Sequence, residues 1–156
     1  MHKRNIYPVL GMLMMLLVSV PLFCFAEQSN PVKDKDMEFI KETDNLVKAM
    51  NENITLKSEQ VKKMWDAGNL QEGYRIEGEI KGIIADYKKQ VGSLPASAEC
   101  GEFKTLIVRL LDLMENMHAA LSEGNTERYK SLLPQVKERS NEMQQELQRL
   151  LKYYKG

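Results

Sequence analysis

The spacing of the apolar residues constrains this chain most, because they recur every three or four positions from residue 30 to residue 154. Four such stripes follow one another, and none alternates apolar and polar residues as a strand would. The stripes are Ile40, Val47, Ile54 and Val61; Ile76, Ile80, Ile83, Tyr87 and Val91; Phe103, Ile107, Leu110, Met114, Met117 and Leu121; and Tyr129, Leu133, Val136, Met143, Leu147, Leu150 and Tyr154. A period near 3.5 predicts four amphipathic helices.

Two Gly-Asn pairs, Gly68-Asn69 and Gly124-Asn125, are typical of a helix end followed by the N-cap of the next helix. A longer linker, 92–97, separates the second helix from the third. We expect helices near 31–67, 70–91, 98–123 and 126–154. Short turns favour antiparallel neighbours, so the chain is predicted to be all-α, an antiparallel up-down-up-down four-helix bundle. Thr55 and Ser58 could each cap the start of a new helix, so the sequence leaves open whether the first helix is continuous near Asn53.

The first 26 residues have the pattern of a secretory signal peptide. Lys3 and Arg4 precede an apolar run, and the segment ends at Cys24-Phe25-Ala26. We therefore expect cleavage after Ala26, a periplasmic location, and one mature domain over 27–156. A retained membrane anchor and lipidation at Cys24 are the alternatives. Pro21 interrupts the apolar run, which argues against a membrane anchor. Bulky Phe23, directly before Cys24, argues against lipidation at that cysteine.

Charge argues against nucleic acid as a partner. Removing Lys3 and Arg4 from 22 basic residues leaves 20, against 22 acidic residues, for a net charge of −2. Both signs are mixed along the chain, without the basic block that phosphate binding needs. After signal cleavage we also expect no membrane span. The expected partner is another periplasmic protein or a small ligand.

Few residues in the mature chain could carry catalysis. His118 and Cys100 are its single histidine and single cysteine. They stand 18 positions apart on one expected helix, which corresponds to roughly 27 Å and excludes a nucleophile–base pair within one chain. No Cys-x-x-Cys-His sequence is present for covalent haem. We therefore expect a protein that is not an enzyme.

Cys100 has two interpretations. In the first turn of the third helix, capped by Ser97, the helix dipole would lower the pKa of its thiol. An intermolecular disulfide, and with it a homodimer, would follow. The alternative is a reduced, buried cysteine without a chemical role.

A candidate metal site is the sequence Met114-x-x-Met117-His118, which places two thioethers and one imidazole on adjacent positions of a helix. Counted from the turns, Met64 of the first helix stands at about the same level. Thioethers and imidazole suit Cu(I), so copper is a candidate ligand. Packing of these methionines in the core is the alternative interpretation.

Two stretches resemble the cytochrome b-562 family of small periplasmic four-helix bundles. Residues 66–89, beginning Asp66-Ala67-Gly68-Asn69, resemble that family's first turn and second helix. Residues 121–143, beginning Leu121-Ser122-Glu123-Gly124-Asn125, resemble its second turn and fourth helix. The resemblance implies the bundle fold and non-covalent haem held by one methionine and one histidine.

The ligand positions that this resemblance implies fall near Ile54 and Gln144, neither of which can bind haem iron. Met50 and Met143, each 19 residues from its turn, would face the core at one level and could ligate haem instead. We therefore expect an exported, non-enzymatic binding bundle without a cofactor. A haem electron carrier and a copper-binding or chaperone-like protein are the alternatives.

Overall fold

The computed structural model describes residues 31–155, and within them the chain is all-α. Its four helices are α2 (Pro31–Asp66), α3 (Leu70–Ser93), α4 (Gly101–Ser122) and α5 (Thr126–Lys155). Each begins and ends within three residues of the bounds expected from the sequence. The predicted signal peptide, 1–26, lies outside the described residues. Helix α2 continues through Asn53 without a break.

The two Gly-Asn turns have the same backbone geometry. Gly68 and Gly124 adopt φ values of +78° and +68°, which L-residues with a side chain rarely adopt. The amide of Asn69 donates to the carbonyl of Met64, and that of Asn125 to Ala120, each at 2.8 Å. These bonds close a Schellman motif at the end of α2 and of α4. Each asparagine side chain then caps the next helix.

The linker differs slightly from expectation. Helix α4 begins at Gly101, with Cys100 as its N-cap residue, and not at residue 98. Ser97 Oγ accepts from the Cys100 amide at 3.3 Å, and Lys104 Nζ donates to the Leu94 carbonyl at 2.6 Å. These two bonds hold the linker against the start of α4.

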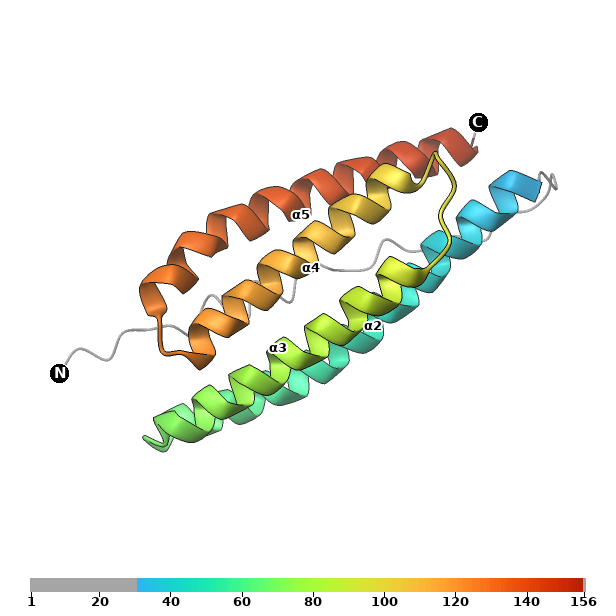
Figure 1. The fold of residues 1–156 in the computed structure, drawn as a ribbon. Helices are drawn as coiled ribbons and strands as arrows, with labels where there is room; N and C mark the ends of the chain where they lie inside the picture. Colours follow the sequence, from blue (N-terminus) through green and yellow to red (C-terminus); the bar gives the residue numbers. More distant parts are fainter. Residues whose placement is uncertain (1–30, 156) are drawn as a thin grey trace.

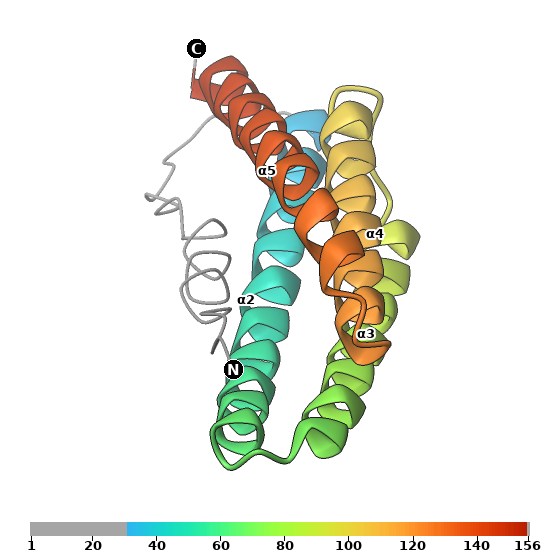
Figure 2. The same cartoon turned by 90° about the vertical axis from the view of Figure 1, so that its left-hand side faces the viewer.

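The helices form two hairpins, α2–α3 and α4–α5, that lie side by side and pack through α3 and α4 (Figures 1 and 2). Both Gly-Asn turns lie at one end, here called the turn end. The 94–100 linker, the start of α2 and the end of α5 lie at the other, the linker end (Figure 1). Close packing joins α2 to α3, α3 to α4 and α4 to α5, whereas α2 and α5 approach each other less closely within the described residues.

The core consists mainly of the apolar stripes. Most of their members are buried, including Val61, Ile80 and Leu150, each of which is 0% exposed. On α3 the stripe is displaced by one residue, because Ile84 is fully buried and Ile83 only partly. At about 25 cal/mol per Å² of buried apolar surface, these side chains supply the main stabilising force. Among the described residues, seven polar or charged residues are buried with them, and most of these belong to the candidate sites below.

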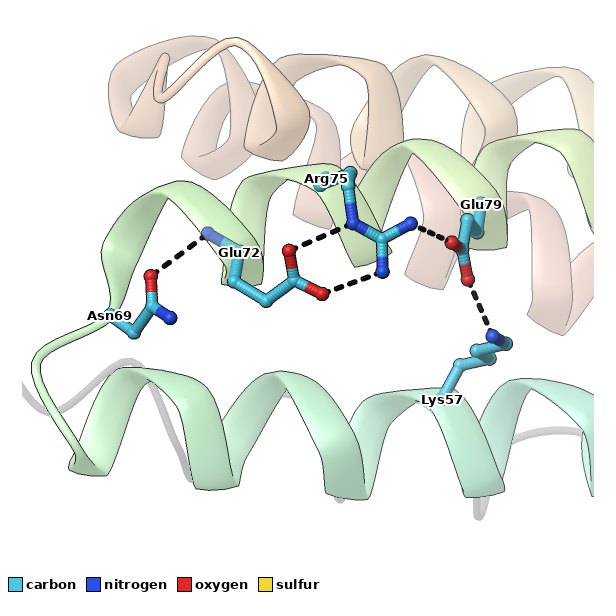
Figure 3. A network of polar contacts seen from close by, with 5 residues as sticks. All are labelled: Lys57, Asn69, Glu72, Arg75 and Glu79. Atoms are coloured by element: carbon cyan, nitrogen blue, oxygen red, sulfur yellow. Dashed lines mark hydrogen bonds and ion pairs between the residues drawn. The ribbon is translucent and has the colours of Figure 1, made fainter.

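A surface ion-pair network ties α2 to α3 (Figure 3). Arg75 contacts Glu72 and Glu79 on its own helix, and Glu79 Oε2 accepts from Lys57 Nζ of α2 at 2.5 Å. Lys57 and then Arg75 hold the pKa of the Glu79 carboxyl below its usual range. These side chains are partly exposed to solvent, so each pair contributes little to stability.

Gly73 is the position where α3 has no room for a side chain. A Cβ there would stand 3.0 Å from Cε2 of the Trp65 indole and closer still to its Nε1 and Cδ1. Gly82, on the same helix, has open space around it. Glycine at Gly73 therefore allows the Trp65 ring to pack directly on the backbone of α3.

The two glycines are expected to respond oppositely to alanine. Gly73→Ala should lower the free energy of unfolding by about 1–3 kcal/mol, because the indole must move out of its site. Gly82→Ala should raise it by about 0.5–1 kcal/mol through helix propensity. Urea titration measures both effects, and the fluorescence of Trp65, the single tryptophan, reports the displacement. Equal stability of the two variants would contradict the proposed packing.

Candidate functional site

Polar or amphipathic side chains from all four helices lie in the core or pack against it near the turn end. These four residues, here called the turn-end cluster, are Trp65 of α2, Glu77 of α3, His118 of α4 and Tyr129 of α5. Glu77 is 0% exposed, and His118 and Tyr129 are 3% exposed. A fully buried carboxylate is unusual and needs a partner.

The partner of Glu77 is His118. Its Nδ1 lies 2.6 Å from Glu77 Oε2, in a bond that joins α3 to α4 inside the core. The spacing of Gly73, Glu77, Ile80 and Ile84 places Glu77 on the core face of α3, where both neighbours in the stripe are apolar. The bond fixes the orientation of the imidazole ring.

Two polar atoms of the turn-end cluster have no hydrogen-bond partner among the described residues. They are Glu77 Oε1 and Trp65 Nε1, both buried. A buried polar atom without a partner costs about 1–3 kcal/mol. The cluster therefore retains hydrogen-bonding capacity that the described residues do not use.

The phenol of Tyr129 is also affected by this environment. Burial, and then the negative charge of Glu77, raise the pKa of Tyr129 from 10 to about 12. The folded state thus favours the neutral phenol. The resulting stability is fully present below pH 10 and is lost as the pH rises through 12.

We expect the Tyr129 phenol to ionise at a pH well above the pH at which an ordinary tyrosine ionises. A titration followed by absorbance at 295 nm should lose its step near pH 12 in Tyr129→Phe. The variant should also resist alkaline unfolding better than the parent between pH 10 and 12. Ionisation of Tyr129 with a midpoint near 10 would contradict the burial of this phenol.

A second polar group, the linker-end cluster, consists of Asp36, Cys100 and Tyr154. The Tyr154 hydroxyl donates to Asp36 Oδ2 at 2.5 Å and lies 4.0 Å from Cys100 Sγ. Asp36 is 1% exposed. Burial, and then the bond to Asp36, raise the pKa of Tyr154 well above its usual range. The bond connects the first turns of α2 to the last turn of α5, where these helices otherwise pack loosely.

The expectation of a lowered thiol pKa at Cys100 is wrong. The side chain is fully buried, so desolvation raises the pKa of the thiol, and the nearby negative charge of Asp36 adds to the effect. Together these effects on the thiol pKa outweigh the lowering expected from the helix dipole. An intermolecular disulfide stays a prediction, and it would require the end of α5 to move away from Cys100.

The candidate copper ligands lie close to the turn end. Met114, Met117 and His118 are buried on α4, and half-buried Met64 packs against the core from α2. Nδ1 of His118 is used by Glu77, a partner that the sequence analysis did not identify. Glu77 could have been found from its position, because it is an acidic residue on an otherwise apolar stripe.

Glu115 and His118 also form a Glu-x-x-His sequence, the spacing found in di-iron bundles. The structure separates them. Glu115 forms an ion pair with Lys88 Nζ at 2.7 Å on the partly exposed side of α4, whereas His118 contacts Glu77 in the core. Within residues 31–155, no three His, Cys, Asp or Glu side chains gather as a metal site.

The candidate haem ligands are both in the core. Met50 of α2 is 1% exposed and Met143 of α5 is 8% exposed. Ile54, which stands at the position implied for a haem ligand, is buried as well. Methionine ligation of haem stays a prediction.

Three buried hydroxyls lack a hydrogen-bond partner in the part of the chain that the structure describes: Thr43 and Ser58 of α2, and Ser140 of α5. The Asp36–Tyr154 bond shows which sides of α2 and α5 face each other at the linker end. At 3.6 residues per turn, Ser58 lies within about 40° of Asp36 around α2, and Ser140 within about 40° of Tyr154 around α5. These facing sides are here called the α2–α5 seam.

No described helix is both long enough and apolar enough to cross a membrane. No family model matches the chain, and neither a curated protein nor a solved structure matches it. The resemblance to cytochrome b-562 therefore stays a prediction.

Proposed function

We propose that this chain is an exported, non-enzymatic binding protein that holds a small ligand between its helices in the periplasm. In this proposal residues 1–26 are a cleaved signal peptide, and the mature chain is an antiparallel up-down-up-down bundle. It is similar to cytochrome b-562 but contains no haem. Ligand sites in helical bundles are commonly formed in the bundle core by side chains on facing helices.

The observation that supports this proposal is the set of unpartnered hydroxyls on the α2–α5 seam. Ser58 and Ser140 come from different helices, are buried, and have no hydrogen-bond partner among the described residues. Leaving each hydroxyl unpaired costs about 1–3 kcal/mol, which a bound polar group would recover. The two helices also pack less closely with each other than with their other neighbours. A ligand with both polar and apolar groups suits such a seam.

Native mass spectrometry tests the proposal. The protein, expressed from the full-length sequence and extracted gently from the periplasm, should carry one non-covalent ligand. Replacing both Ser58 and Ser140 with alanine should remove that additional mass. Ser131→Ala is the matched control, because Ser131 is an exposed serine of α5 whose hydroxyl donates to the Arg128 carbonyl. This variant should retain the ligand.

Two results would overturn the proposal. One is a protein without bound ligand in every preparation. The other is enzymatic turnover that is lost on replacing Cys100 or His118. A ligand that remains in the doubly substituted protein would place binding elsewhere and would equally refute the role of the seam.

The alternative, a haem electron carrier, has one supporting observation, the burial of Met50 and Met143 on α2 and α5. Titration of the protein with haem should then give a Soret band that saturates at one equivalent. Met50→Ala and Met143→Ala should each abolish it. A flat spectrum after haem addition would exclude this alternative.

A further inference from the structure

The orientation of His118 in the turn-end cluster suits a metal ion. Glu77 holds Nδ1 in a hydrogen bond, so Nε2 is the ring nitrogen left to bind a metal. In the neutral tautomer with its proton on Nδ1, the ring presents the lone pair of Nε2. A carboxylate that holds one imidazole nitrogen while the other binds a metal is the usual second-shell arrangement around histidine ligands.

The neighbouring donors are soft. Met114 lies one turn before His118 on the same face of α4, and helical side chains lean toward the preceding turn. Met114 is 4% exposed and Met117 is 1% exposed. Thioether and imidazole ligands together favour Cu(I) over the harder divalent ions.

Charge also favours a monovalent ion. A buried Glu77 carboxylate beside a neutral imidazole leaves one negative charge without compensation, and a buried uncompensated charge is costly. Cu(I) bound at Nε2 would neutralise it. If the imidazole is protonated, Cu(I) takes the place of the Nε2 proton, which leaves to solvent, and the net charge of the cluster is unchanged. A divalent ion would leave one positive charge in the core.

We propose that His118, Met114 and Met117 form a buried Cu(I) site, with half-buried Met64 at its edge, and that Glu77 is the positioning residue for His118. This inference deepens the proposed binding function by naming a metal ligand. It uses residues different from those of the α2–α5 seam. The two proposals can therefore fail separately. Variants that lose copper binding should keep the ligand seen by native mass spectrometry, and the Ser58 and Ser140 variant that loses that ligand should still bind copper.

The experiment is an anaerobic competition titration of the full-length-derived protein with Cu(I) alone against a chromogenic Cu(I) chelator. One equivalent should bind. Met114→Leu leaves the Glu77–His118 bond intact and should weaken binding at least about tenfold. Glu77→Gln keeps a hydrogen-bond acceptor for Nδ1 and should weaken it by about 10–100-fold. His118→Gln should abolish it. Met37→Leu, which alters a half-buried methionine of α2 near the linker end, should change nothing.

X-ray absorption of the copper-loaded protein should show nitrogen and sulfur ligands together, with the sulfur contribution reduced in Met114→Leu. A merely structural role for His118 would give no nitrogen ligand. Unchanged affinity in both Met114→Leu and His118→Gln would overturn the proposal. A loss confined to Cys100→Ser would place the ion on the thiol, and an equal loss in Met37→Leu would indicate a general effect on the core. Either result would refute the site.

Discussion

Replacing His118 with leucine is expected to lower the free energy of unfolding by about 3–5 kcal/mol. The variant leaves the fully buried carboxylate of Glu77 with no partner on Oε2, while Oε1 already lacks one. Transferring an uncompensated charge into the core costs more than the leucine can recover by apolar packing. Urea denaturation followed by circular dichroism measures the loss.

The double variant Glu77→Leu with His118→Leu separates the cost of a stranded charge from the loss of the bond. Replacing both partners by apolar side chains is often neutral or stabilising, so most of the loss should be recovered. Lys130→Ala, which breaks an exposed pair with Glu127, is the control and should change stability by less than about 0.5 kcal/mol. A double variant as unstable as the single one would show that the pair itself, and not the stranded carboxylate, determines the effect.

Tyr154→Phe is expected to destabilise the protein by about 1–3 kcal/mol, because Asp36 then remains buried without its hydroxyl donor. The bond that joins the start of α2 to the end of α5 is lost, so the linker end should open more often. The thiol of Cys100, now fully buried, should therefore react faster with a disulfide reagent. Urea titration and the rate of thiol modification measure the two effects.

Tyr153→Phe provides the matched control. Tyr153 is the adjacent residue, carries the same hydroxyl and is 59% exposed. Its replacement should leave both stability and thiol reactivity unchanged. If Tyr153→Phe and Tyr154→Phe behave alike, the Asp36–Tyr154 bond does not hold the linker end closed.

Much of the fold could be predicted because its determinants are local. The Gly-Asn turns need φ above zero at one residue and an N-cap side chain at the next, and both requirements are visible in the sequence. The start of α4 was misplaced by three residues, because Ser97 bonds the Cys100 amide and burial of Cys100 selects the helix start. That burial also reversed the predicted direction of the shift in the thiol pKa.

The candidate site was only partly predictable. Met114, Met117 and His118 stand together in the sequence, but Glu77 is 41 residues away from His118. The apolar stripe around Glu77 indicates that it is buried, but nothing local indicates that His118 is its partner. Likewise, Gly73 is one of several glycines, and only the Trp65 ring packed on it explains why it must stay small.

Within residues 31–155, the sequence by itself determined the number of helices, their bounds within a few residues and the side of each that faces inward. These properties follow from apolar periodicity and capping, which act over a few residues. Tertiary structure alone decided which polar groups meet inside the core, such as Glu77 with His118 and Asp36 with Tyr154. Their partners come from different helices, so they meet only when the hairpins pack, and burial then sets their electrostatic properties.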